Sequence, residues 1–220
     1  MPPLVALPDL TDAASRARAI STFETSLRHE AKAQLTTGLD GLRVARSLAA
    51  SRVALLKELF LLAEPPAELA LLVTGGLGRG VAAPYSDLDL VFLVRSPDAP
   101  GVEPFLQRFL YPLWDAGLTV GHATHTPTSY LELAQGDLTV LTSALDRRPG
   151  AGDQRLTEEL DSMLSERVRT PEFTEIMIDA VRTWTAGVNS ATAHRLEPDI
   201  KSGAGGLRTL HEVWWAARFA

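Results

Sequence analysis

Two aspartates separated by a single leucine stand at the head of an apolar run. Asp87 and Asp89 alternate with leucines in residues 87–94, and side chains two positions apart on a strand point to the same side. Two carboxylates held that closely repel each other unless a cation lies between them. The pattern therefore predicts a metal site at the start of a strand.

A glycine pair precedes these acids. Gly75 and Gly76 follow an apolar run, and ten residues separate Gly76 from Asp87. Glycine lets phosphate oxygens approach backbone N–H groups closely, and a helix starting just beyond adds a favourable dipole. The spacing fits neither a Walker A loop, which needs a lysine, nor the G-x-G-x-x-G dinucleotide motif. A glycine turn beside paired acids indicates a nucleotide triphosphate site, whereas a glycine pair alone is more often only a tight turn, and Ser86 and Asp87 alone are more often a plain turn or helix cap.

Composition narrows the class of protein. The 220 residues carry a formal net charge of −6, and 45% are hydrophobic, which is typical of a globular protein. The absence of cysteine excludes disulfides and thiolate metal sites, and fits a cytoplasmic location. The start lacks the features of a signal peptide, and no apolar run approaches the roughly 18 residues of a membrane span. The acidic balance disfavours nucleic-acid binding.

Hydrophobic periodicity predicts an α+β fold, with a mixed sheet between helical segments. We expect an N-terminal helical segment (1–66), a central core (67–150) and a C-terminal helical segment (151–220). The expected helices are 12–37, 41–63, 102–116, 127–135, 153–168 and 171–193, with one or two helical turns in 77–83. The expected strands are 69–74, 87–94 and 117–124, with a strand edge at 142–148; the pattern becomes helical again after 149–152. Residues 210–220 resemble a helix interior, so we expect a longer protein of which this is the N-terminal part.

Several segments resemble one family. Residues 75–80 (GGLGRG) and 84–90 (PYSDLDL) are similar to the GGYGRGEL-x-P-x-SDIDL motif of the PII uridylyltransferase (GlnD) family, which belongs to the DNA polymerase β-like nucleotidyltransferase superfamily. Further resemblances follow in the family's order at 113–122, 137–140, 145–148 and 196–208. The resemblance implies the superfamily's fold, and transfer of UMP from UTP to a tyrosine of a PII nitrogen-regulatory protein, with release of pyrophosphate.

The resemblance also implies roles for individual residues. Asp87 and Asp89 would hold two Mg²⁺ ions, with Asp146 as the expected third carboxylate and Asp115 as an alternative. Magnesium suits such a site because it prefers a few carboxylates plus substrate phosphates. The expected nucleotide contacts are Gly75, Gly76, Arg79, Ser86, Arg148, Lys201 and Arg208. For Arg79 and Arg148 a surface or structural salt bridge is the competing interpretation, and for the loop of Lys201 and Arg208 it is a plain interhelix turn. His122 is either a phosphate contact or a structural residue.

Departures from the family's motifs keep other functions open. Leu77 replaces the usual tyrosine, Ala204 the usual proline, and Thr209 the aspartate that normally follows GGLR. The chain is therefore either an active uridylyltransferase or a catalytically silent nucleotide-binding regulatory module. Adenylylation of the same kind of partner from ATP is a further alternative. A transferase acting on a small molecule is disfavoured by the match at 196–208.

Overall fold

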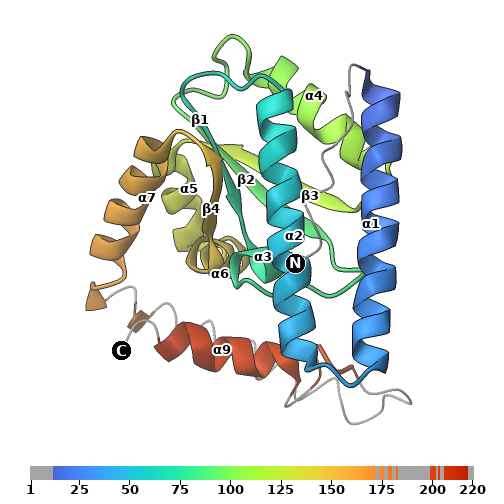
Figure 1. Ribbon diagram of the computed structural model, residues 1–220. Coiled ribbons are helices and arrows are strands. Elements are labelled where there is room, and N and C mark those ends of the chain that lie inside the picture. The colour runs from blue at the N-terminus through green and yellow to red at the C-terminus, as the bar shows by residue number, and fades with distance from the viewer. Residues whose placement is uncertain are drawn as a thin grey trace. The chain divides into compact units, whose positions relative to one another are not determined.

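The computed structural model describes residues 12–171, 174–175, 178–179, 182, 199–201, 203 and 206–217. Two long helices precede the first strand, and further helices separate the strands that follow (Figure 1). In chain order they are α1 (Ala13–Thr36), α2 (Gly41–Leu62), β1 (Leu69–Val73), α3 (Gly75–Gly78), β2 (Leu88–Val94), α4 (Val102–Asp115), β3 (Val120–His125), α5 (Pro127–Gly136), α6 (Leu138–Asp146), β4 (Arg148–Gly152), α7 (Gln154–Arg167) and α9 (Leu207–Ala217).

The four strands form one mixed sheet in the order β3-β2-β1-β4. The strand β1 runs antiparallel to both β2 and β4, whereas β2 and β3 are parallel. The register places Val73 opposite Leu90 and Asp89 opposite Gly121. Because β2 lies between two strands, the residues at its start are fixed by neighbours on both sides.

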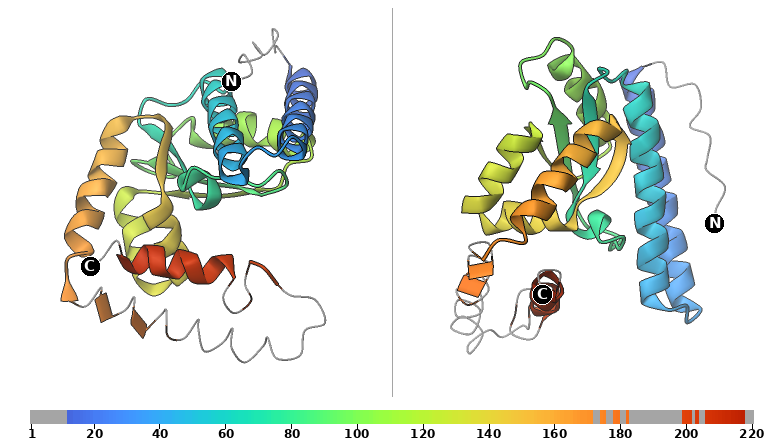
Figure 2. Two further views of the ribbon diagram at one scale, coloured as in Figure 1. Left: turned by 60° about the horizontal axis from the view of Figure 1, so that its bottom comes forward. Right: turned by 90° about the vertical axis from the view of Figure 1, so that its left-hand side faces the viewer.

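The long helices α1 and α2 lie side by side against one face of the sheet (Figures 1 and 2). Asp12 caps α1 by accepting a hydrogen bond from Ser15 N–H, and Asp40 caps α2 in the same way through Leu42. The chain reverses between the helices at Gly38, whose φ is +83°. Alternate residues of β1 and β2 pack against these helices and α4; they include Leu69, Leu71, Val73, Leu88, Leu90, Phe92 and Val94. The expected mixed sheet with flanking helices is thus confirmed.

The chain forms two compact units. One comprises Met1–Ser129 and Asp146–Glu159 and contains the sheet together with α1 to α4. The other comprises Tyr130–Leu145 and Leu160–Ala220. Within this second unit the Tyr130 hydroxyl donates to Ser143, which joins α5 to α6, and Trp215 of α9 is buried.

Most of the expected elements lie within two or three residues of the observed ones, but the strand edge expected at 142–148 was predicted wrongly. Residues 142–146 belong to α6, which Asp137 caps through the N–H groups of Thr139 and Val140, and not to a strand. Residues 149–152, for which no strand was expected, are part of β4. Proline is tolerated there because β4 is an edge strand, and a Cβ on Gly152 would collide with the backbone of β1.

Two other expected helical segments are residues 77–83 and residues 171–193. The helical turn expected in 77–83 is the single turn α3, which begins at Gly75. The helix expected at 171–193 falls mostly outside the described residues. Among the described helices, none combines the length and the hydropathy needed to cross a bilayer.

Candidate active site

The carboxylate of Asp89 lies between two glycines. A Cβ built on Gly75 would stand 2.5 Å from Oδ2 of Asp89, and one built on Gly121 would stand 3.4 Å from its Oδ1. Gly75 also has a φ of +53°, a conformation that residues with a side chain rarely adopt. The backbone of the same aspartate is fixed by Thr74, whose N–H and hydroxyl both donate to the Asp89 carbonyl, at 2.9 and 3.2 Å. Asp89 is therefore held at its backbone and flanked at its carboxylate, yet exposed to solvent.

The loop that precedes Asp87 is fixed by the buried side chain of Arg52. The guanidinium of Arg52 donates to Glu24 through Nε and Nη2, at 2.9 and 2.8 Å. The same guanidinium donates to the carbonyls of Ala83 and Pro84, both at 2.8 Å, and to the Ser86 hydroxyl at 3.2 Å. These five hydrogen bonds match the five N–H donors of an arginine. Two helices and the loop leading to Asp87 thus share one anchor.

Ser86 has a structural role through its hydrogen bond with Arg52. Its hydroxyl accepts from Arg52 and donates to the Ala83 carbonyl at 3.0 Å, which closes the turn directly before Asp87. Asp87 itself is exposed, and the ladder of β2 begins at the next residue, where Leu88 N–H donates to Thr119. Ser86 was expected at the nucleotide; the structure shows it shaping the backbone beside the nucleotide-binding candidates.

The rest of the glycine turn lies against two other candidate residues. The carbonyl of Asp146 occupies the space that a Cβ on Gly78 would need. The guanidinium of Arg148, the first residue of β4, lies over Gly80, where a Cβ would stand 2.9 Å from Nη2. Gly80 has a φ of +75°. The glycines of this turn therefore make room for Asp89, Asp146 and Arg148, which brings these three candidates to one place.

Asp146 and Arg79 form an ion pair at this place. Nη1 of Arg79 donates to Oδ2 of Asp146, whose side chain is 2% exposed. The Nε of Arg79 is also buried and has no hydrogen-bond partner in the described part of the chain. A buried N–H without an acceptor is costly, so a phosphate oxygen arriving beside Arg79 would satisfy it.

His122 and Asp115, two other candidates of the first unit, do not belong to this group. Since Gly121 shares the face of Asp89, its neighbour His122 points to the opposite face, where its ring lies 5.6 Å from that of Trp114. Asp115 is the last residue of α4 and is exposed. In the second unit the Lys201 carbonyl accepts from Arg208 N–H at 2.8 Å, which closes the turn before α9.

Comparison with known proteins places the chain in a family. The family model of GlnD PII-uridylyltransferase matches residues 182–220. A bifunctional uridylyltransferase/uridylyl-removing enzyme of Caulobacter vibrioides is 34% identical over 223 residues, which cover 94% of this chain and 24% of that protein. Proteins of the same name from Bradyrhizobium and Rhodospirillum rubrum are 37% and 39% identical, each over 69% of this chain and 16% of their own length.

The chain belongs to the GlnD PII-uridylyltransferase family. It spans about a quarter of the length of the Caulobacter relative. The resemblance to this family that the sequence motifs indicated is therefore confirmed.

The two aspartates fit the divalent cation that this family implies. Asp87 and Asp89 are exposed carboxylates two residues apart, and Mg²⁺ is commonly held by one or two carboxylates together with substrate phosphates and water. In the described ranges no three histidine, aspartate or glutamate side chains are grouped so as to hold a metal ion. The expected third carboxylate, Asp146, faces Arg79 instead.

Three residues that support this candidate site were not expected from the sequence. They are Thr74, which holds the Asp89 backbone, and Glu24 and Arg52, which hold the loop before Asp87. A signal for the pair is present in the sequence, because each charged residue interrupts an apolar helical stripe. Arg52 stands between Leu48 and Leu55 or Leu56, and Glu24 stands between Ile20 and Leu27.

Proposed function

We propose that this chain transfers UMP from UTP to a tyrosine of a PII signalling protein, in a reaction that depends on Mg²⁺. The observation that supports it best is the placing of Asp89 between Gly75 and Gly121, directly after a loop anchored by Arg52. Such rigid support is what a site needs if it is to align two substrates. The family membership supplies the donor and the acceptor of the proposal.

In the proposed reaction the tyrosine oxygen attacks the α-phosphorus of UTP. The bond from that phosphorus to the oxygen that bridges to the β-phosphate breaks, pyrophosphate leaves, and the phenolic proton passes to solvent. A Mg²⁺ ion bound by Asp87 and Asp89 would neutralise charge on the phosphates and favour ionisation of the phenol, whose ordinary pKa is about 10. UTP as donor makes the cytoplasm the proposed location.

The chain's own side chains would orient the reactants. Arg79, with a buried N–H lacking an acceptor, and Arg148, lying over Gly80, are the proposed partners of the phosphates, since guanidinium pairs well with phosphate oxygens. Asp146 fixes the Arg79 guanidinium from the other side. Asp146 as a third metal ligand is the alternative, and it requires the carboxylate to leave Arg79.

Label transfer tests the proposal. The chain is incubated with Mg²⁺, a PII protein and UTP labelled at the α-phosphate, and ATP replaces UTP in a parallel arm. We expect UMP transfer, and a loss of at least about a hundredfold in Asp87→Asn and Asp89→Asn. Asp98→Asn, which removes an exposed carboxylate in the loop after β2, serves as the matched control. Transfer from ATP but not from UTP would identify ATP as the nucleotide donor. Undiminished transfer by the variant that combines Asp87→Asn with Asp89→Asn would refute the proposed site.

A nucleotide-binding module without turnover is the second candidate function. The ion pair between Asp146 and Arg79 favours it, because it occupies the carboxylate expected to complete the metal site. Calorimetry with UTP and Mg²⁺ separates the two candidates. Binding of UTP without any label transfer to the PII protein would identify the silent module.

A further inference from the structure

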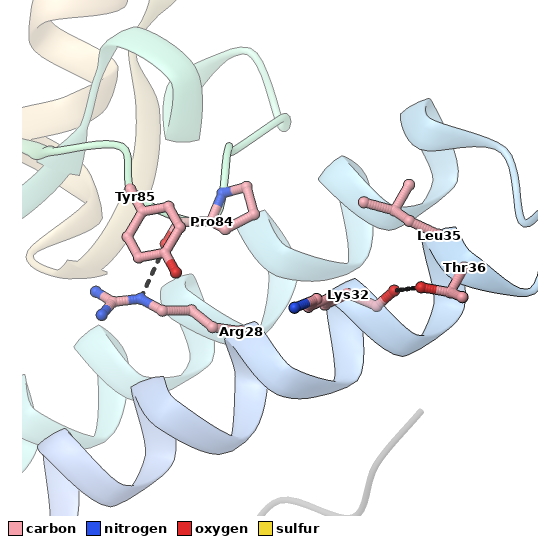
Figure 3. A pocket seen from close by; sticks show the side chains of 6 residues that line it. All are labelled: Arg28, Lys32, Leu35, Thr36, Pro84 and Tyr85. Atoms are coloured by element: carbon pink, nitrogen blue, oxygen red, sulfur yellow. Dashed lines mark hydrogen bonds between the residues drawn. The ribbon is translucent and has the colours of Figure 1, made fainter.

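A cationic groove lies beside the loop that leads to Asp87. Six residues line a cavity of about 450 Å³ between α1 and this loop (Figure 3), and we call it the α1 groove; they are Arg28, Lys32, Leu35, Thr36, Pro84 and Tyr85. All six belong to the first compact unit. The groove contains none of the residues assigned above to the metal or the phosphates.

One wall of the groove is built by Arg28 and Tyr85. The guanidinium of Arg28 lies over the Tyr85 ring, 4.9 Å from its centroid, and its Nε donates to the Pro84 carbonyl at 3.0 Å (Figure 3). The same carbonyl accepts from Arg52 at 2.8 Å. Tyr85 nevertheless remains 80% exposed, so the wall offers a flat aromatic surface held in place by two arginines.

The groove carries a local positive charge on an acidic protein. Arg28 lies 3.7 Å from Glu24, but that buried carboxylate is already paired with Arg52 at 2.8 Å. Lys32, one helical turn after Arg28, is exposed, and no carboxylate forms an ion pair with it among the described residues. Two cations, Arg28 and Lys32, thus line the groove, while Arg52 already neutralises the carboxylate of Glu24. Against a net charge of −6 for the whole chain, this local surplus is suited to an anionic partner.

The position of the groove indicates what the partner is. Pro84 and Tyr85 line it, and Asp87 follows two residues after Tyr85. A polypeptide segment lying in the groove would therefore present its neighbouring residues to the proposed metal site. The exposed side chains of Leu35 and Tyr85 add apolar surface, which favours a peptide over a free anion.

We propose that the α1 groove binds a carboxylate-bearing segment of the acceptor protein, next to the residue that receives the nucleotide. This inference rests on the proposed function for the identity of the acceptor. The acidic side chains of the segment would pair with Lys32 and Arg28, and an apolar or aromatic side chain would lie on Tyr85. The groove thus selects the acceptor, whereas Asp87 and Asp89 act on the nucleotide.

Charge reversal at Lys32 tests this role. In steady-state transfer assays we expect Lys32→Glu to raise KM for the PII protein about three- to tenfold, with kcat and KM for UTP unchanged. Lys57→Glu is the control, because it makes the same change of net charge at an exposed site of α2 outside the groove. Tyr85→Ala should also raise KM for the PII protein. Added salt should narrow the difference between wild type and Lys32→Glu.

Other results would overturn the groove as the acceptor site. They are a Lys32→Glu variant that behaves like Lys57→Glu, or one in which KM for UTP rises and KM for the PII protein does not. If wild-type protein transfers no label, the proposed function fails, and the groove is then judged from the Kd of the PII protein measured by fluorescence anisotropy. Equal Kd values for wild type and Lys32→Glu, or no binding to wild type, would refute it.

Discussion

Arg52 of α2 donates two hydrogen bonds to the carboxylate of Glu24 on α1, and both side chains are almost completely buried. The remaining donors of the guanidinium reach the loop before Asp87. The helical hairpin α1–α2 is thus joined to the loop of the proposed site through Arg52, and Arg28 of α1 adds a further hydrogen bond to the Pro84 carbonyl. Its role extends beyond covering the sheet.

Removing one partner of this pair is expected to be costly. Arg52→Met leaves the carboxylate of Glu24 buried without its main cation, and such losses typically lower the free energy of unfolding by about 3–5 kcal/mol. Glu24→Leu combined with Arg52→Met removes the unpaired charge, so we expect the double variant to be more stable than Arg52→Met alone. Urea denaturation measures both. Arg95→Met, at an exposed ion pair with Glu159, should cost no more than about 1 kcal/mol, and an equal cost at Arg52 would contradict the prediction.

Gly75 should tolerate no side chain, because the carboxylate of Asp89 occupies the place of its Cβ. We expect Gly75→Ala to lower the rate of transfer at least about tenfold by displacing that carboxylate. Gly38→Ala is a matched control. Gly38 also has a positive φ, but no atom lies within 4 Å of its Cβ position.

Both alanine variants should lose stability through the backbone, by about 1 kcal/mol or more. Only Gly75→Ala should lose activity, or require more Mg²⁺ for half-maximal rate. Thermal unfolding together with Mg²⁺ titration of the transfer rate distinguishes the two effects. Full activity in Gly75→Ala would show that the position of Asp89 does not matter for the reaction.

Asp146→Asn separates the two roles open to Asp146. If Asp146 holds Arg79 for the phosphates, the variant should raise KM for UTP about tenfold, and Arg79→Lys should do the same. The Mg²⁺ concentration for half-maximal rate would then stay constant in both variants. A higher Mg²⁺ requirement in Asp146→Asn, with no such rise in Arg79→Lys, would instead identify Asp146 as the third metal ligand.

Stability should depend on pH through His125. Burial lowers the pKa of this imidazole below its ordinary value of 6.5. As pH falls below about 6.5 the unfolded chain therefore takes up a proton at this position before the folded chain does, and the free energy of unfolding decreases. Above that pH the contribution of His125 to the free energy of unfolding is fully present. Urea denaturation between neutral and mildly acidic pH should show a smaller decrease in His125→Gln than in the wild type, and parallel curves would contradict the assignment.

The sequence predicted those parts of the site that depend on local spacing. Asp89 of β2, Asp87 just before that strand and the glycine pair are recognisable because strand alternation and turn chemistry act over a few residues. The strand β4 was missed because its proline and glycines are typical of a turn, and only the neighbouring strand β1 explains them. The ion pair of Asp146 with Arg79 joins residues 67 positions apart, so tertiary packing alone determines it.

The charged residues within the apolar stripes were predictable only in part. Glu24 and Arg52 are visible as interruptions of two helical patterns, and charged residues are seldom fully buried unless they are paired. The sequence therefore contains the signal that each needs a partner. That the partner of one is the other, and that the loop 83–86 shares the same guanidinium, follows from the antiparallel helices and is visible in the structure alone.

The anchor at Arg52 has a consequence for the order of folding. Its hydrogen bonds join segments 28 to 34 residues apart, and contacts of such separation form only after the cost of closing the intervening chain has been met. Helices α1 and α2 can form locally, but the loop before Asp87 acquires its shape only when both have docked on the sheet. A partly folded chain would have its helices without a site, so the proposed activity would appear last during refolding, together with burial of Arg52.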